Sequence, residues 1–215
     1  MIRGKFITLE GGEGVGKTTN LTFIKDYLQQ HKISVVVTRE PGGTALAEKI
    51  RHLLLDKDNE VISEHAELLL IFAARAQHIK HIIEPALARG DWVLCDRFTD
   101  ATYAYQGGGR SMRVSTIEWL EHLVQGNLKP DLTVLLDAPV EIGMERAGKR
   151  GAYDRFESEK ISFFEQVRRF REFEIKRSRL SEILHMLRLP RQVNIFMPRR
   201  EKAVRASWEF KCRPL

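Results

Sequence analysis

Apolar residues along the chain fall into two patterns, short continuous runs and stretches with helical spacing. The short runs predict buried strands at residues 6–9, 33–38, 92–95 and 132–137. Between and after them, helical spacing predicts helices at residues 18–28, 45–56, 63–88, 115–124 and 140–147. Strands that alternate with helices predict an α/β fold, a single doubly wound parallel sheet with helices on both faces.

Glycine, proline and charge interrupt this pattern at three places. The segment 63–88 is expected to be one long helix up to Pro85 or a kinked pair. Three consecutive glycines, Gly107–Gly109, predict a loop. The segment 148–157 is polar, basic and broken by two glycines, and we expect a mobile flap between two helices there. No repeat longer than a strand–helix unit occurs, so residues 1–215 are predicted to form one domain.

Composition narrows the class of protein. With 43% apolar residues the chain can form a core, yet no run approaches the length of a membrane span and residue 6 already enters a strand, so we expect a cytoplasmic protein without a membrane partner. Cys95 and Cys212 lack metal-ligand spacing and predict unpaired thiols. The net charge of +6 could indicate nucleic acid, but the basic residues lack the interleaved aromatics of single-strand binders. Phosphorylated ligands explain the charge equally well, and no nucleic-acid partner is expected.

Residues 11–18 fit the pattern G-x-x-x-x-G-K-[ST], between the first strand and the first helix. Such a loop points backbone N–H groups at phosphate oxygens, in front of the positive end of the helix. Lys17 is expected to reach the terminal phosphates and the Thr18 hydroxyl to ligate Mg²⁺. The predicted nucleotide-binding residues are Gly11, Gly12, Glu13, Gly14, Val15, Gly16, Lys17, Thr18 and Thr19.

Charged residues follow two further strands, where ligands of open α/β sheets bind. Arg39 comes after the second strand and is a candidate for holding a phosphate. Asp96 and Arg97 come after the third, and the carboxylate is a candidate for Mg²⁺ with the arginine free for phosphate. Arg75 lies in an apolar helical stripe and must either be paired or face a ligand.

Several of these motifs together resemble one family, the bacterial thymidylate kinases, which transfer phosphate from ATP to dTMP. The resemblance spans about residues 1–170 and rests on segments 11–19, 38–44, 72–77, 96–98, 104–107, 136–137 and 150–157. It implies ATP as co-substrate, dTMP as substrate, Mg²⁺ as cofactor and a homodimer, which the apolar faces of 63–83 and 115–124 also favour. It also implies that the flap is a lid, at about residues 147–157.

The resemblance further implies roles for single residues. Phe72 would stack on thymine and Arg75 would donate to its carbonyl. Arg39 and Arg97 would hold the dTMP phosphate, and Thr102, Tyr105 and Gln106 would line the nucleoside, with the Tyr105 ring leaving no room for a ribose hydroxyl. The remaining implied roles are a Glu13 carboxylate near the sugar hydroxyl, Arg146 at ATP, Lys149 and Arg150 over the transferring phosphoryl group, and Glu157 near the metal.

Two departures from the family pattern stand out. Ala101 replaces a serine of many members, and residues 173–215 form an atypical C-terminal segment in which a short strand at 192–197 remains possible. Among other functions, a GTP-binding switch would need an Asn-Lys-x-Asp tetrapeptide, which the sequence lacks. A deoxynucleoside kinase, or another P-loop NTPase, is the alternative. A neutral hydroxyl acceptor calls for a carboxylate base, whereas Arg39, Arg75 and Arg97 favour an anionic phosphate acceptor.

Overall fold

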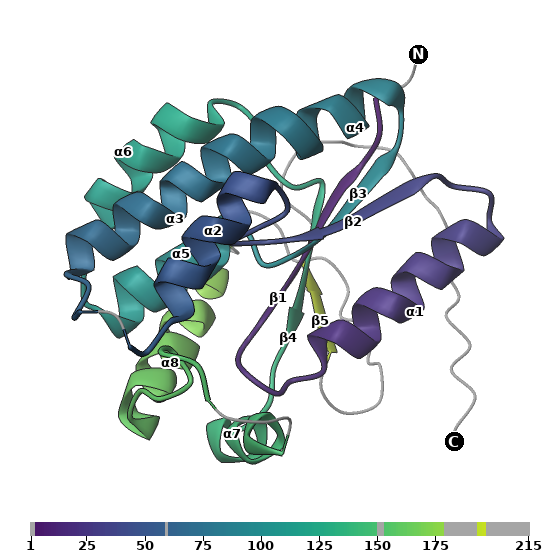
Figure 1. Cartoon of the computed structure of the whole chain (residues 1–215). Coiled ribbons are helices and arrows are strands. Elements are labelled where there is room, and N and C mark those ends of the chain that lie inside the picture. Colours follow the sequence, from purple (N-terminus) through teal and green to yellow (C-terminus); the bar gives the residue numbers. More distant parts are fainter. Residues whose placement is uncertain (1–2, 59, 150–152, 179–192, 197–215) are drawn as a thin grey trace.

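The computed structural model describes residues 3–58, 60–149, 153–178 and 193–196, with a five-stranded sheet at its centre (Figure 1). The strand order is β2-β3-β1-β4-β5; the first four pair in parallel and β5 runs antiparallel to β4 at the edge. The strands are β1 Phe6–Gly11, β2 Val35–Arg39, β3 Trp92–Asp96, β4 Leu132–Leu136 and β5 Val193–Phe196. The four predicted strands are confirmed, and so is the short strand in the C-terminal segment.

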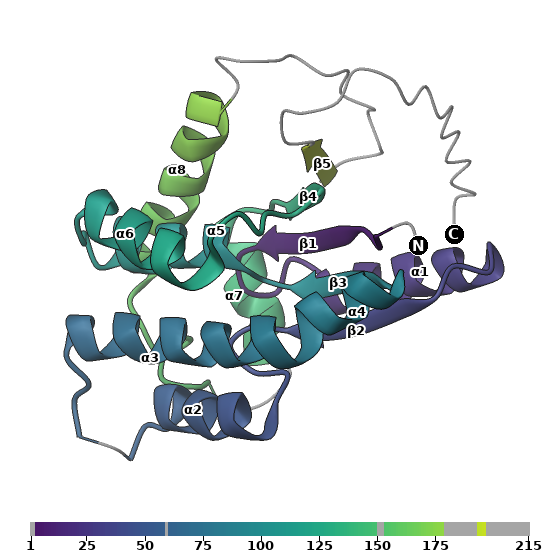
Figure 2. The same cartoon turned by 90° about the horizontal axis from the view of Figure 1, so that it is seen from above.

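Helices cover both faces of the sheet, as predicted (Figure 2). Successive residues of β1 point to opposite faces: Phe6 packs with residues of η1 and α4, whereas Ile7 and Leu9 pack with Leu21 of α1. The α-helices are α1 Lys17–Gln30, α2 Ala45–Leu55, α3 Glu64–His78, α4 Glu84–Arg89, α5 Thr99–Thr102, α6 Val114–Gln125, α7 Val140–Gly148 and α8 Ile161–Ser178. Two π-helical segments, η1 Ile79–Ile83 and η2 Tyr103–Gly109, continue α3 and α5.

Of the two expectations for residues 63–88, the end near Pro85 is wrong, and the pair of helices is closer to the structure: η1 separates α3 from α4, and α4 continues to Arg89. The π-helical turn η1 precedes Pro85, which occupies the first turn of α4, where a missing N–H is tolerated. Gly90, with a φ of 87°, ends the helix in the left-handed conformation.

The predicted loop at Gly107–Gly109 is also wrong, because these glycines lie in η2. A Cβ atom on Gly108 would come within 2.5 Å of the Phe170 side chain, and one on Gly109 within 2.4 Å of the Phe163 ring. Their lack of a side chain therefore lets α8 approach η2 closely.

Gly14 shows the same principle in the phosphate loop. Its φ is 62°, and a Cβ on it would lie 2.0 Å from the Gly143 carbonyl oxygen of α7. A Cβ on Gly143 would in turn lie 2.3 Å from the Glu13 carbonyl oxygen, so the loop and α7 touch through their backbones.

None of the helices in the described part of the chain has the length and apolar character needed to cross a membrane. The buried Cys95 carries a free thiol.

Candidate active site

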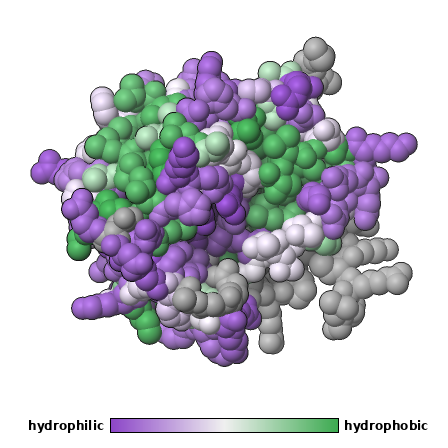
Figure 3. Space-filling view, viewed as in Figure 1, coloured by the Kyte–Doolittle hydropathy of each residue, from purple (hydrophilic) through white to green (hydrophobic). Residues whose placement is uncertain are grey.

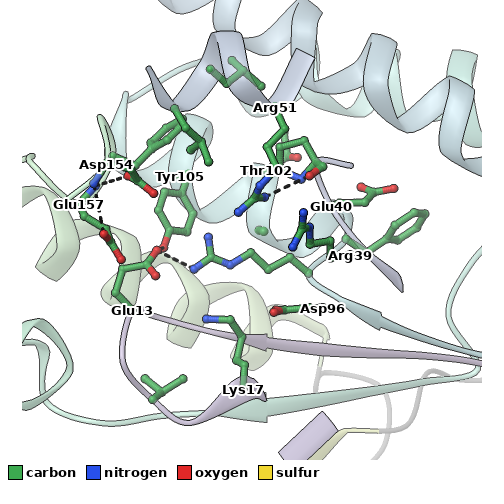
Figure 4. A pocket seen from close by; sticks show the side chains of 18 of the residues that line it. Glu13, Lys17, Arg39, Glu40, Arg51, Asp96, Thr102, Tyr105, Asp154 and Glu157 are labelled. Atoms are coloured by element: carbon green, nitrogen blue, oxygen red, sulfur yellow. Dashed lines mark hydrogen bonds and ion pairs between the residues drawn. The ribbon is translucent and has the colours of Figure 1, made fainter. Parts of the chain in front are cut away.

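A cleft of about 340 Å³ opens at the carboxyl ends of the parallel strands, bordered by the phosphate loop, α2, η2 and residues 154–157. Glu13 and Lys17 lie on the phosphate-loop side of the cleft and Arg51 lies across from them, while Asp96 lies beside its register partner Arg39 (Figure 4). Most predicted site residues line it, namely Glu13, Gly14, Val15, Gly16, Lys17, Thr18, Thr19, Arg39, Arg75, Asp96, Arg97, Thr102, Tyr105, Gln106, Arg146 and Glu157.

The phosphate loop wraps around the side chain of Lys17, the first residue of α1. Gly16 precedes it with a φ of 93°, and Lys17 Nζ donates to the carbonyl oxygens of Gly12 at 2.6 Å and Gly11 at 3.3 Å. Burial and the nearby positive charge of Arg97 lower the pKa of Lys17 to about 8. The ammonium group is thus held at the mouth of the loop in a place that favours an anion.

Arg97 lies between Glu13 and Tyr105. The backbone φ of Arg97 is 67°, in the left-handed region that is unfavourable for arginine. Residues with such strained backbone conformations cluster at functional sites. Arg97 Nη2 donates to Glu13 Oε1 at 2.6 Å, and the Tyr105 hydroxyl donates to the same oxygen at 2.8 Å. Burial alone would raise the pKa of Glu13, but Arg97, Lys17 and these hydrogen bonds together hold it well below its usual range. Glu13 is therefore a fixed negative charge that orients both partners.

Glu40 is a buried carboxylate that lies between Arg75 and His78. Arg75 Nε donates to Glu40 Oε2 at 2.7 Å, and His78 Nδ1 lies 2.9 Å from Oε1. Arg75 Nη2 donates to Thr102 Oγ1 at 2.8 Å, while its Nη1 has no hydrogen-bond partner among the described residues. From its place in an apolar stripe, Arg75 was expected either to be paired or to face a ligand. It does both: it pairs with Glu40, and its Nη1 is left as a donor for a ligand.

The structure does not bring Phe72 to the surface of the cleft. Its ring is 2% exposed and packs with Leu68, Met112 and Ile117, and it is not among the residues that line the cleft. The Arg75 guanidinium carbon lies 4.8 Å from the ring centroid. Phe72 therefore packs against Arg75, and its stacking on a base stays a prediction.

Two charged residues of the cleft were missed by the sequence reasoning. Arg51 of α2 donates to the Pro41 carbonyl at 3.1 Å, and burial together with Arg39 and Arg97 lowers the pKa of Arg51. Glu40 was noticed only as part of a motif. Arg51 could have been found from the sequence, because it lies on the amphipathic helix that directly follows the loop after Arg39. Arg39 itself pairs with Glu48 at 2.9 Å.

Asp96 and Thr18 are the predicted metal ligands in the cleft. Asp96 Oδ1 is buried and has no hydrogen-bond partner among the described residues, and the Thr18 residue at the start of α1 is exposed. No group of three or more His, Cys, Asp or Glu side chains in the described part of the chain could hold a metal. A hard cation that takes most of its ligands from phosphates and water fits these residues.

The predicted lid residues are placed only in part. Lys149 pairs with Glu145 at 2.6 Å on the surface of α7, with its side chain 71% exposed, and it does not line the cleft. Glu157 borders the cleft, where its backbone N–H bonds Asp154 Oδ1 at 2.8 Å. Arg150 lies outside the described residues. Gly11 and Gly12 belong to the strand end and the loop but do not line this cleft.

Comparison with known proteins gives concordant matches. The family model described as Thymidylate kinase matches residues 9–184. The chain is 62% identical over 165 residues to thymidylate kinase of Teredinibacter turnerae, which covers 77% of this chain and 80% of that protein. It is 61% identical to thymidylate kinase of Pseudomonas putida, with 77% and 79% covered. The solved structure of thymidylate kinase from Ehrlichia chaffeensis matches with a TM-score of 0.67 at 34% identity, covering 83% of this chain and 89% of that one.

Proposed function

Because the chain belongs to the thymidylate kinase family and is a dTMP kinase that transfers the γ-phosphate of ATP to dTMP, we propose how its residues divide this work. The main observation behind this assignment of residues to ATP and dTMP is the arrangement of cations in the cleft. Lys17 stands at the phosphate loop, Arg39 and Arg51 border the cleft beyond the end of β2, and Arg97 lies between them with Nη2 2.6 Å from Glu13 Oε1. Two groups of cations suit two phosphorylated ligands better than one.

ATP binds at the phosphate loop in this proposal. The backbone N–H groups of residues 11–19 and the N-terminus of α1 hold its phosphates, and Lys17 exchanges its loop carbonyls for the terminal phosphates. Arg146, on the cleft side of α7, lies toward the nucleoside part of ATP. No covalent enzyme intermediate is needed, because alignment of the two nucleotides and neutralisation of charge account for the transfer.

The dTMP phosphate binds between Arg39, Arg51 and Arg97. Each guanidinium has donors beyond those used inside the chain, and Arg97 is close enough to Glu13 to keep its orientation while it binds phosphate. The Tyr105 ring, 5.0 Å from the Arg97 guanidinium carbon, packs against the sugar, and Glu13 lies near the sugar hydroxyl. A uridine or cytidine ribonucleotide would bring its 2′-hydroxyl against this ring.

The base is recognised by Arg75, Thr102 and Gln106. Arg75 Nη1 donates to a thymine carbonyl oxygen, whereas the amino group of cytosine would place a donor against a donor. Thr102 holds Arg75 in this orientation. Phe72 stacks on the base if its ring becomes exposed on binding.

Mg²⁺ would be held by Thr18 and Asp96, with Glu157 near it. Bound there, the ion would neutralise charge on the transferring phosphates. Lys149 and Arg150 would act over the same phosphates as part of a lid at about residues 147–157 of a single domain that spans 1–215. With such a lid closed, these cations would contact the phosphoryl group mainly in the transition state.

We also propose a homodimer in the cytoplasm, without nucleic-acid or membrane partners. The exposed apolar residues Leu69, Trp119 and Leu123, 57–64% exposed, lie on α3 and α6. Figure 3 shows hydrophobic residues gathered on the side of the molecule where Figure 1 places α2, α3 and α6. Pairing of these helices between two copies would bury them.

A coupled assay with ATP and a panel of nucleoside monophosphates and nucleosides tests the proposal. We expect kcat/KM to be highest for dTMP, lower for dUMP and dCMP, and near background for thymidine. A protein that phosphorylates thymidine as well as dTMP would refute the assignment of the arginines to an acceptor phosphate.

A further inference from the structure

Glu67 of α3 is a buried carboxylate that belongs to no role described above. It is 1% exposed, and three side chains donate to it. They are Gln106 Nε2 at 2.8 Å, Arg155 Nη2 at 2.6 Å and Arg110, whose Nε and Nη2 lie at 3.4 and 3.3 Å. A buried carboxylate with this many partners is costly to disturb, because any change leaves a donor or a charge unpaired.

Two of these partners fix residues 153–159, which we call the wall segment. Arg155 donates from Nε to the Leu54 carbonyl at 2.6 Å, and its backbone N–H bonds the Leu55 carbonyl at 3.1 Å, at the end of α2. Arg110 pairs through Nη1 with Glu159 at 2.6 Å. Glu67 therefore anchors the wall segment near both of its ends.

The third partner lies on the substrate side. Gln106 borders the cleft, as do Asp154, Phe156 and Glu157 of the wall segment, whereas Glu67 itself does not. The carboxylate thus lies behind the cleft and joins Gln106, which we place at the base, to the wall segment, where we place the phosphates. Its two oxygens are shared between them: Gln106 bonds Oε1 and Arg155 bonds Oε2.

We propose that Glu67 is a positioning residue that couples the dTMP pocket to the wall segment. When dTMP engages Gln106, the hydrogen bond to Oε1 fixes the carboxylate, and Oε2 then holds Arg155 and the wall segment beside the phosphates. This inference rests on the proposed role of Gln106 at the base. The coupling needs a carboxylate, because a glutamine has only one acceptor oxygen: its amide N–H₂ would face the arginines, which can only donate, or Gln106 would have to turn its own amide away from its present orientation.

Glu67→Gln in the full chain tests the inference. Calorimetry gives the affinity for dTMP with and without a saturating non-hydrolysable ATP analogue, and the ratio measures the coupling between the two sites. In Glu67→Gln we expect the ratio of the two dTMP affinities, with and without the ATP analogue, to fall to about 1. We expect kcat to fall about tenfold or more, while the affinity for dTMP alone changes by about threefold at most. Glu64→Gln, an exposed glutamate at the start of the same helix, is the matched control and should change none of these values.

Arg155→Gln provides an independent variant, should Glu67→Gln fail to fold. It should lower the coupling and kcat in the same direction, and the double variant should lose less than the sum of the two single losses, because the two residues share the contact between Arg155 Nη2 and Glu67 Oε2. Glu67→Asp, which keeps the charge, should restore part of kcat. A variant with a lowered Tm but wild-type coupling and kcat would overturn the inference and leave the proposed function standing. Loss of dTMP kinase activity in the wild-type chain would instead overturn the proposed function.

Discussion

The pKa of Lys17 leads to a prediction about the pH dependence of catalysis. Burial and Arg97 lower this pKa to about 8, and the terminal phosphates of ATP require the charged form. Because kcat/KM reports groups of the free enzyme, kcat/KM for ATP should fall above about pH 8. At pH 9 about one Lys17 in eleven would remain protonated, so kcat/KM should be about tenfold lower than its plateau. A lysine at its ordinary value of 10.5 would show almost no decrease at that pH.

The assay is a pH series from 6.5 to 9.5, with ATP varied at a dTMP concentration well below its KM, so that kcat/KM for ATP refers to the free enzyme. Lys17→Arg keeps a positive charge throughout this range, so this variant should be slower but should show a much flatter decrease above pH 8. A wild-type kcat/KM that stays constant up to pH 9.5 would refute the reasoning.

Glu10 is the group that could imitate this effect. It is a buried residue of β1, next to the first residue of the phosphate loop, and burial together with Asp100 raises its pKa to about 8, so it ionises over the same range. Glu10→Gln resembles the protonated carboxyl group and can still accept the hydrogen bond from the Phe98 N–H, which measures 2.7 Å in the wild type. If Lys17 is responsible, Glu10→Gln should keep the full decrease above pH 8; a flat profile in this variant would assign the decrease to Glu10.

Two further predictions concern Arg75 and the stability contributed by Glu10. Arg75→Ala should lower the dTMP:dCMP ratio of kcat/KM by about tenfold or more, and an unchanged ratio would make Arg75 purely structural. The same variant should destabilise the fold by about 3–5 kcal/mol, because Glu40 stays buried without the Arg75 guanidinium. Between about pH 4.5 and pH 8 the folded protein holds a proton on Glu10 that the unfolded chain releases, so the free energy of unfolding should fall as pH rises through this window. In urea titrations at pH 5 and pH 8, Glu10→Gln should show a smaller decrease than the wild type, and an equal decrease would contradict the raised pKa.

The strands and the positions of most site residues could be predicted, because both depend on local pattern. A strand of β-branched residues and the loop that ends it place Arg39, Asp96 and Arg97 at one sheet edge without knowledge of the rest. Contacts between distant segments could not be predicted in this way. Gly107–Gly109 were assigned to a loop because glycine favours loops, whereas their role depends on Phe163 and Phe170 of α8.

The same limit applies to partners within the site. Helical spacing marked Arg75 as unusual, but its carboxylate partner Glu40 lies 35 residues earlier, and nothing in the spacing links the two. Phe23 is an example on the surface of the molecule: it fits the helical apolar pattern of α1, yet it is 53% exposed. Periodicity identifies a face of a helix, and only the packing of other elements decides how far around the helix that face is covered.

The acceptor part of the cleft combines fixed ion pairs with unbalanced positive charge. Arg97 pairs with Glu13 and Arg39 with Glu48, while Arg51 has only a carbonyl partner in the contacts described above. Burial lowers the pKa of Arg51, and the positive charges of Arg39 and Arg97 lower it further. A phosphate dianion would relieve the repulsion among these charges through guanidinium donors that the ion pairs leave available, so no internal pair has to break on binding. A neutral nucleoside would leave the repulsion in place, and the free protein is therefore already arranged to prefer a nucleotide as acceptor.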